Sequence, residues 1–236
     1  MLKIIPAIDL IGGQNVRLSQ GDYQTKSLMD RTPVEAIDFY QSCDRVARIH
    51  IVDLIGAKAK EAREMDLIAS LAKRSPLPLE IGGGIRDQAT LEAYDRQGLA
   101  YFILGTAAIK DVAWLAEMTE AYPGRIFVGL DAREDRIFIN GWTEDSGLTL
   151  GDYLPQVEDL DLAGLIYTDI DRDGMKKGPN LQRTARLRQA TRHKVVASGG
   201  VRNLADLIDL EKLGIEEAVV GKACNTDEFW RELGCK

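Results

Sequence analysis

Short apolar segments alternate along the whole chain with longer segments of helical period. Eight of the apolar segments are four to six residues long, and they lack the strict alternation of a strand with one solvated face. Continuous apolar character is typical of parallel strands that are covered on both faces. The eight predicted strands are residues 3–8, 47–52, 77–81, 101–104, 126–130, 164–168, 194–197 and 217–220.

The segments between these strands carry signals for helix starts. Thr32 is followed by Pro33, which suits the first turn of a helix. Asp87 and Asn203 can cap the helices that follow the third and the seventh strand. Eight strand–helix units predict an α/β fold, the (β/α)8 TIM barrel. An open doubly wound sheet is the alternative, but no G-x-G-x-x-G fingerprint follows the first strand.

The two halves of the chain resemble each other. Residues 83–111 align without a gap with residues 199–227, and nine of these 29 positions are identical. Repeats often indicate a solenoid, but here the period is half the chain. We therefore predict a barrel built from two repeated half-barrels, about 1–122 and 123–236, within a single domain 1–236. The same alignment pairs Asp53 with Asp169, Gly83-Gly84 with Gly199-Gly200, and Arg86 with Arg202.

Composition and charge argue mainly against certain classes of protein. The formal net charge of -7 argues against a general nucleic-acid binder but allows a local basic pocket for an anionic metabolite. The first apolar run is interrupted by Lys3, Pro6 and Asp9, so it is typical neither of a signal peptide nor of a membrane span. The three cysteines fit a reducing cytosol better than a disulfide framework. We expect a cytoplasmic monomer without membrane or nucleic-acid partners.

Glycine turns follow four of the predicted strands, at the carboxyl ends where barrels of this class carry their sites. Bare backbone N–H groups in such turns can cradle a phosphate, because no Cβ blocks the approach. A tight strand–helix connection would also use a Gly-Gly pair. Four turns, after strands three, four, seven and eight, favour a small-molecule substrate with two phosphates. Their residues are Gly83, Gly84, Gly105, Thr106, Ser198, Gly199, Gly200, Gly221 and Lys222.

Two carboxylates end equivalent strands of the halves. Asp9 follows the first strand, and Asp131 follows the fifth. Ionised carboxylates at apolar strand ends are costly unless they are solvated, paired or used in chemistry. Each could accept hydrogen bonds from loop N–H groups, but their symmetric placement favours an acid/base pair that flanks one substrate. Symmetry leaves open which carboxylate is the acid.

The remaining candidates are weaker. His50 lies within the second strand near the rim, where substrate contact and packing are equally open, whereas His193 starts the seventh strand and is expected at the surface. Neither histidine has ligand spacing with a cysteine, so no metal site is predicted. Lys222 lies in a phosphate turn, where charge pairing explains it better than a Schiff base. Trp142, in a long loop after strand five, could stack on a heterocycle or pack under the loop.

At several places the chain resembles the histidine-biosynthesis isomerase family, phosphoribosylformimino-5-aminoimidazole carboxamide ribotide (ProFAR) isomerase. The resemblance covers nearly the whole chain. It implies a half-barrel-duplicated (β/α)8 enzyme that needs no cofactor and performs an Amadori rearrangement of an aminoaldose to an aminoketose. The residues that carry it are Ile5-Pro6-Ala7-Ile8-Asp9-Leu10, Val16–Tyr23, His50–Leu54, Gly82-Gly83-Gly84-Ile85-Arg86, Gly141-Trp142, Thr168–Gly174, Ser198–Val201 and Val220–Ala223.

The resemblance also implies roles for the site residues. Asp131 would be the general acid that helps open the ribose ring, and Asp9 the base that moves the C2′ proton. Thr168 and Asp173 would support the site. Arg17 and Trp142 would be loop contacts that close over the substrate, and the glycine turns would hold its phosphates.

Three other functions remain open. The related cyclase of the same pathway shares the fold, both Asp positions and the turns, but tends to have a Lys eight residues past the Asp, where this chain has Arg17. Some isomerases of the family also act on phosphoribosylanthranilate. A non-catalytic phosphosugar-binding barrel is disfavoured by the Asp pair. The segment 56–64 is more charged and less Gly-rich than the resemblance implies, so its substrate contacts are open.

Overall fold

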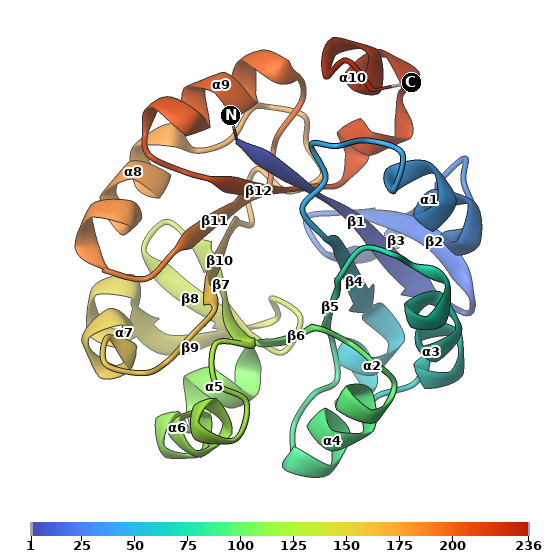
Figure 1. Ribbon diagram of the computed structural model, residues 1–236. Coiled ribbons are helices and arrows are strands. Elements are labelled where there is room, and N and C mark those ends of the chain that lie inside the picture. The colour runs from blue at the N-terminus through green and yellow to red at the C-terminus, as the bar shows by residue number, and fades with distance from the viewer. Residues whose placement is uncertain (1, 236) are drawn as a thin grey trace.

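Eight parallel strands form a closed barrel in the computed structural model, which describes residues 2–235. Neighbouring strands pair in the order β10-β11-β12-β1-β4-β5-β6-β7, and parallel pairing of β7 with β10 closes the ring (Figure 1). The predicted (β/α)8 fold is confirmed. The barrel strands are β1 (Lys3–Ile11), β4 (Ile49–Asp53), β5 (Leu79–Gly82), β6 (Tyr101–Leu104), β7 (Ile126–Arg133), β10 (Gly164–Asp169), β11 (Val195–Ser198) and β12 (Glu217–Val220).

Helices surround the barrel (Figure 1). The expected caps are present: Thr32 forms a capping box with Glu35, while Asp87 and Asn203 accept hydrogen bonds from the first turns of their helices. The longer helices are α1 (Pro33–Tyr40), α3 (Met65–Arg74), α4 (Gln88–Arg96), α6 (Val112–Ala121), α7 (Leu150–Val157), α8 (Leu181–Ala190) and α9 (Leu204–Lys212). Shorter ones are α2 (Leu54–Ala59), α5 (Thr106–Lys110), the 3-10 helix η1 (Lys222–Asn225) and α10 (Asp227–Glu232).

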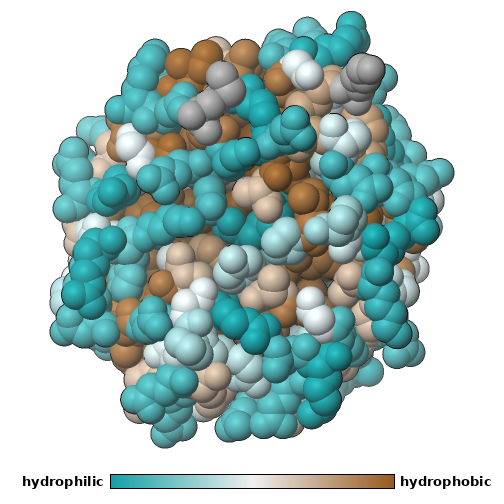
Figure 2. All heavy atoms as spheres, in the orientation of Figure 1, coloured by the Kyte–Doolittle hydropathy of each residue, from teal (hydrophilic) through white to brown (hydrophobic). Residues whose placement is uncertain are grey.

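Alternate strand residues fill the barrel or pack under the helices. A small buried cluster lies inside the barrel, and a much larger one lies between the strands and the helices. Both faces of the barrel strands are therefore covered, which explains their continuous apolar pattern. The inner cluster consists of Ile5, Ala7, Phe127, Ile166, Val196 and Val219. Seen in the orientation of Figure 1, hydrophilic side chains occupy much of the outer rim (Figure 2).

Two β-hairpins extend the sheet beyond the barrel. β2 (Gln14–Ser19) and β3 (Asp22–Leu28) follow β1, and β8 (Arg136–Ile139) and β9 (Glu144–Thr149) follow β7. The expectation of a long loop carrying Trp142 is wrong, because Trp142 lies in the turn of the second hairpin. The outer strands β3 and β9 contain no buried residue, so no apolar run marks them. Each half-barrel thus carries a hairpin after its first barrel strand, β1 in one half and β7 in the other.

Cys43 and Cys235 form a disulfide, so the expectation of a reduced set of cysteines is wrong for this pair. Their sequence separation of 192 residues conceals the pairing. Pairing of β1 with β12 brings the two ends of the chain together, and Trp230 stacks on Tyr40 with ring centroids 5.2 Å apart. Cys224 is a free, buried thiol. Within residues 2–235, none of the helices combines the length and apolar character needed to cross a membrane.

Candidate active site

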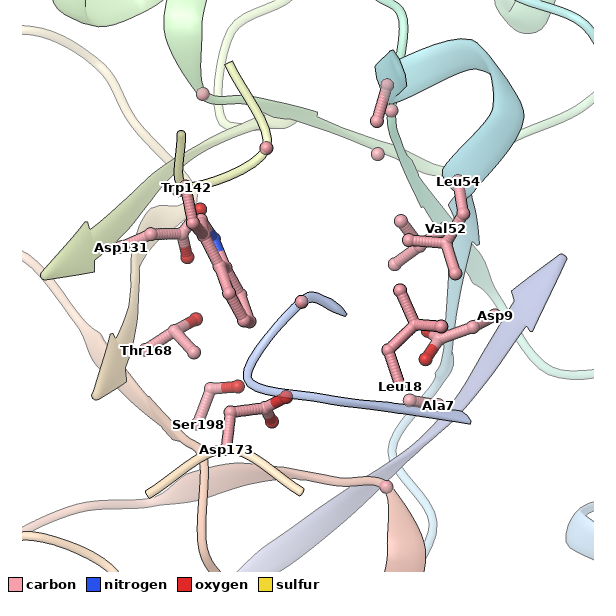
Figure 3. Close-up of a pocket in the computed structure, with 18 of the residues that line it drawn as sticks. Ala7, Asp9, Leu18, Val52, Leu54, Asp131, Trp142, Thr168, Asp173 and Ser198 are labelled. Carbon is pink, nitrogen blue, oxygen red and sulfur yellow. The ribbon is translucent and has the colours of Figure 1, made fainter. Parts of the chain in front are cut away.

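All sixteen site residues predicted from the sequence line one cavity at the carboxyl ends of the barrel strands. Asp9 lies on one side of this cavity, and Asp131 lies across from it beside Trp142 and Thr168 (Figure 3). The strands end at one rim because they are parallel, so residues from distant parts of the chain converge there. The residues are therefore close enough to contact one substrate, which the sequence could only suggest.

Burial has the largest effect on the Asp131 carboxyl. It is partly buried at the end of β7, in register with Thr168 of the neighbouring strand β10. Burial raises the pKa of the Asp131 carboxyl, and hydrogen bonds from Trp142 and Thr168, together with the charge of His50, oppose that shift without cancelling it. Such a carboxyl holds its proton to a higher pH than an ordinary aspartate does, as a general acid requires.

Asp9 differs from Asp131 in having a cationic partner. Its Oδ2 lies 2.8 Å from Nη1 of the buried Arg17, which the adjacent antiparallel strand β2 carries. Arg17 also donates to the backbone oxygens of Val16 and Ala7, so the guanidinium is held in place. The ion pair is a contact with the carboxylate, which is the form that a base needs. Arg17 thus lies in a strand and contacts Asp9, instead of extending from a loop.

Asp173 is a third carboxyl in the cavity. Its pKa is raised to about 7, first by burial and then by the nearby charges of Asp9 and Asp131, while Arg17 and Lys222 act in the opposite direction. Three carboxyls in one cavity cannot all be ionised cheaply at neutral pH. The Asp173 carboxyl is therefore expected to keep its proton up to about neutral pH.

Asp173→Asn is expected to stabilise the protein more at pH 8 than at pH 5. The folded-state pKa of Asp173, about 7, lies above the ordinary value of 3.8. Between these two pH values the folded wild type binds more protons than the unfolded chain, so its stability falls as the pH rises from 3.8 to about 7. Above pH 7 the full cost applies, on the order of a few kcal/mol, and an amide of equal size does not bear it. Thermal unfolding at both pH values measures the gain. Equal gains at pH 5 and pH 8 would contradict the assignment.

The two Gly-Gly turns are glycine for reasons internal to the protein. Gly83 has φ +98°, and a Cβ there would lie 2.3 Å from the backbone oxygen of Asp53. Its repeat partner Gly199 has φ +90° and faces the backbone oxygen of Asp169 at 2.8 Å. A side chain at either position would displace a neighbouring loop. The glycines are thus required by loop packing, and phosphate binding rests on where the turns lie rather than on their residue type.

Asp53 and Asp169 anchor the loops beside these turns. Asp53 accepts hydrogen bonds from the backbone N–H groups of Gly56, Arg63 and Glu64. Asp169 accepts from the side chain of Asn180 at 2.7 Å. The sequence left open that Asp9 or Asp131 serves to bind loop groups. In the structure the repeated pair Asp53 and Asp169 anchors the loops. In the charged segment 56–64, α2 forms the first part, and Asp53 binds the last.

The two ends of the cavity carry different cations. Lys222 donates to Ser19 Oγ at 2.9 Å and to the backbone oxygen of Gly174 at 2.7 Å. At the other end Arg86, which was not among the predicted site residues, donates to Asn140 Oδ1 at 2.9 Å. Burial lowers the pKa of Arg86, and the charge of Glu144 only partly opposes that. The signal was present in the sequence, since Arg86 directly follows the Gly-rich turn and Ile85.

The repeat does not extend to the environment of this arginine. Arg202 aligns with Arg86, but its guanidinium pairs with Asp206 at 2.7 Å, whereas the position that aligns with Asp206 is Thr90. Arg202 is thus neutralised by its own helix, and Arg86 lines the cavity. One substitution in the repeat separates a structural arginine from one available to an anion.

Trp142 joins the two hairpins over the cavity. Its ring lies against Gly21 in the turn between β2 and β3, where a Cβ would come 2.6 Å from the ring. Trp142 itself has φ +70°, an unusual conformation for a bulky residue and one that often marks a functional site. The tryptophan thus reaches from the hairpin of one half-barrel to that of the other.

The two histidines differ in position and in burial. His50 lines the cavity, as its candidate role requires. His193 precedes β11 at the other end of the barrel, as expected, but the expectation of a surface position is wrong. It is buried, with Nε2 3.0 Å from the backbone oxygen of Val157. The imidazole satisfies a carbonyl at the end of α7, a contact between residues 36 positions apart.

Comparison with known families adds the final observation. Residues 3–229 match the family model described as histidine biosynthesis protein. The match spans the whole barrel, both hairpins and every strand end that lines the cavity. The protein therefore belongs to the histidine biosynthesis protein family and is a barrel enzyme of that pathway.

Proposed function

We propose that the protein is the ProFAR isomerase of histidine biosynthesis, which converts the aminoaldose ProFAR to its aminoketose by acid/base catalysis. The observation that carries the proposal is the contrast between two carboxyls across one cavity. Burial raises the pKa of Asp131, whereas Asp9 is paired with Arg17. A proton transfer between adjacent carbons requires one group that acts as an acid and one that acts as a base. Different surroundings can give two carboxyls these two roles.

Asp131 acts first in the proposed reaction. It donates a proton to the ribose ring oxygen while the C1′–O bond breaks and the nitrogen lone pair forms a C=N bond. The Asp9 carboxylate then removes the C2′ proton. The electrons of the broken C2′–H bond form a C1′=C2′ bond, while the C=N π electrons return to the nitrogen as its lone pair. Transfer of the 2′-hydroxyl proton to C1′ completes the aminoketose. Each step moves a proton, so no nucleophile or oxidant is required.

The two ends of the cavity support a substrate with two phosphates. The turns at Gly83 and Gly105 lie with Arg86 at one end, and those at Gly199 and Gly221 lie with Lys222 at the other. Backbone N–H groups and one cation would bind each phosphate. The partly buried guanidinium of Arg86 gains most from an anion, because it contacts only a neutral amide among the hydrogen-bond partners described for it.

Two ions are expected in a crystal soaked in sulfate, one at each end of the cavity. The first should contact the turn at Gly83 and Gly84 and the second the turn at Gly199 and Gly200, because each end offers turn amides and a cation. Diffraction from soaked and unsoaked crystals would show both. A single ion beside Gly199 and Gly200 would contradict a substrate with two phosphates.

Incubation with ProFAR tests the proposal directly. The purified protein should convert ProFAR to the aminoketose, followed by its absorbance change, without ammonia or any cofactor. Absence of turnover would overturn the isomerase. Turnover of the aminoketose only when ammonia is supplied would instead identify the cyclase. A parallel assay with phosphoribosylanthranilate shows whether the same carboxyls serve a second substrate.

A further inference from the structure

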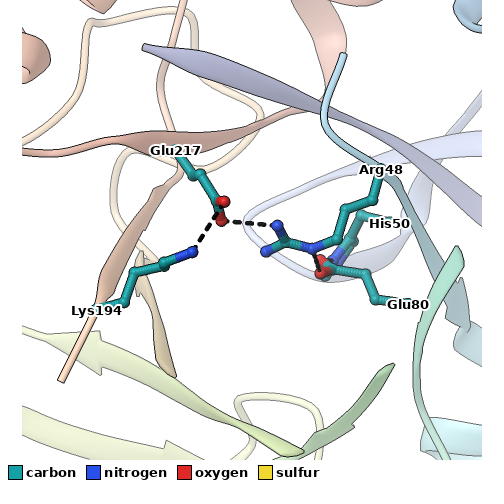
Figure 4. Close-up of polar contacts among 5 residues, drawn as sticks. All are labelled: Arg48, His50, Glu80, Lys194 and Glu217. Carbon is teal, nitrogen blue, oxygen red and sulfur yellow. Dashed lines mark hydrogen bonds and ion pairs between the residues drawn. The ribbon is translucent and has the colours of Figure 1, made fainter. Parts of the chain in front are cut away.

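Glu80 lies inside the barrel, beneath the cavity, and joins two cationic or ionisable side chains. Its Oε1 is 2.6 Å from Nδ1 of His50, and its Oε2 accepts from Nε of Arg48 (Figure 4). The Glu80 carboxylate is completely buried, whereas the His50 side chain is 12% exposed and lines the cavity. Glu80 therefore contacts a group that faces substrate without facing substrate itself.

Arg48 holds Glu80 in one orientation. Nη1 of Arg48 lies 2.7 Å from Glu217 Oε2, and its guanidinium lies 4.7 Å from the centroid of the Phe127 ring. Glu217 in turn pairs with Lys194 at 3.1 Å (Figure 4). A guanidinium has only donors, so the oxygen of Glu80 that faces Arg48 must accept. The other oxygen is then directed at His50.

The carboxylate state of Glu80 sets the state of the imidazole. Burial alone would raise the pKa of Glu80, but the hydrogen bonds and charges of His50 and Arg48 together hold it below its ordinary value. A carboxylate can only accept, so Nδ1 of His50 must carry a hydrogen. Nε2 is then the ring nitrogen that remains for a ligand in the cavity.

We propose that Glu80, oriented by Arg48, is a positioning residue that fixes His50 with its hydrogen on Nδ1 and presents Nε2 to the substrate. This inference rests on the proposed function, because it assigns His50 to the same cavity as Asp9 and Asp131. In the neutral ring Nε2 accepts a hydrogen bond, from a sugar hydroxyl of the phosphoribosyl substrate. The ring also lies close enough to Asp131 to interact with that carboxyl.

Glu80→Gln tests the inference because the amide reverses the hydrogen bond. Arg48 takes the amide oxygen, since it can only donate, and the amide nitrogen then faces His50. Nδ1 must accept, so the hydrogen of the neutral ring moves to Nε2 and the cavity loses its acceptor. Orienting partners of metal-bound histidines are worth about 10- to 100-fold, and we expect kcat/KM to fall by about 10-fold here.

Nitrogen-15 spectra of the histidine rings report the hydrogen positions without substrate. The chain has two histidines, and His193 serves as an internal reference because its Nε2 faces a carbonyl and must carry the hydrogen. We expect the neutral rings of His50 and His193 to be opposite tautomers in the wild type and the same tautomer in Glu80→Gln. A wild-type His50 with its hydrogen on Nε2 alone would overturn the proposal, even if the variant did not fold.

Glu217→Gln is the matched control. It alters the same network through Arg48 but does not contact His50, so the tautomer and kcat/KM should stay as in the wild type.

A double-mutant cycle with His50→Asn completes the test. If Glu80 acts through His50, Glu80→Gln has little further effect once His50 is replaced. Additive losses, or a Glu80→Gln enzyme with wild-type kcat/KM, would contradict the proposal. Wild-type protein inactive on ProFAR would instead refute the proposed function, and the ring spectra would still decide the hydrogen bond.

Discussion

Asp131→Asn is expected to lower kcat on ProFAR by at least about 10²-fold, or about 2.7 kcal/mol of transition-state stabilisation. The asparagine keeps the size of the aspartate but cannot supply an acidic proton to the ring oxygen. Burial raises the pKa of the Asp131 carboxyl, so the wild type stays active to a higher pH than an ordinary aspartic acid would allow, and kcat falls once that carboxyl loses its proton. The residual activity of the variant should lack this decline. Initial rates at saturating ProFAR across pH measure both effects.

The matched control is Asp171→Asn. Asp171 is two residues from Asp173 in the chain, but its half-exposed side chain pairs with Arg133 at 3.7 Å and does not line the cavity. Its replacement should leave kcat unchanged. The assignment of the acid would be overturned by an Asp131→Asn enzyme that folds, binds ProFAR and retains near-full kcat.

Asp9→Asn is expected to cost at least about 10²-fold in kcat as well, for the opposite reason. An amide cannot remove the C2′ proton, and the substitution also leaves the buried Arg17 without the carboxylate that neutralises it. The substitution keeps the size of the side chain and leaves the backbone N–H groups of the phosphate turns unchanged, so substrate affinity should change much less than kcat. Calorimetric binding together with rates at saturation separates the two quantities.

The two variants should also differ in stability. Asp131→Asn removes a carboxyl whose ionisation burial disfavours, whereas Asp9→Asn removes one partner of a buried ion pair. We therefore expect Asp9→Asn to lower the unfolding temperature at neutral pH and Asp131→Asn to leave it equal or higher. Unfolding curves of both variants check this. Equal destabilisation by the two would mean that their surroundings differ less than the structure indicates.

The barrel could be predicted because its signals are local or repeated. Each strand is apolar on both faces, and each predicted cap lies within three residues of the amide it binds. The duplication placed Gly83 opposite Gly199, and Asp9 opposite Asp131, without any structural information. Since parallel strands end at one rim, the position of the site followed from the fold.

The hairpins, the disulfide and the burial of His193 could not be predicted in the same way. Polar strands such as β3 have no hydrophobic period, and Cys43 meets Cys235 only because the last barrel strand pairs with the first. The imidazole of His193 is buried by α7, which lies in a different strand–helix unit. Each of these contacts joins residues that nothing in the local sequence relates.

The sequence by itself determined the barrel, its two halves and the set of residues at the mouth, because burial on both strand faces and a half-chain repeat are visible in one dimension. Only the tertiary structure decided how equivalent residues diverge. Asp9 faces Arg17 and Asp131 faces Trp142, just as Arg202 meets Asp206 while Arg86 faces the cavity. The charge state of a carboxyl or the availability of a guanidinium depends on neighbours a few ångströms away, and folding brings those neighbours from distant positions in the chain.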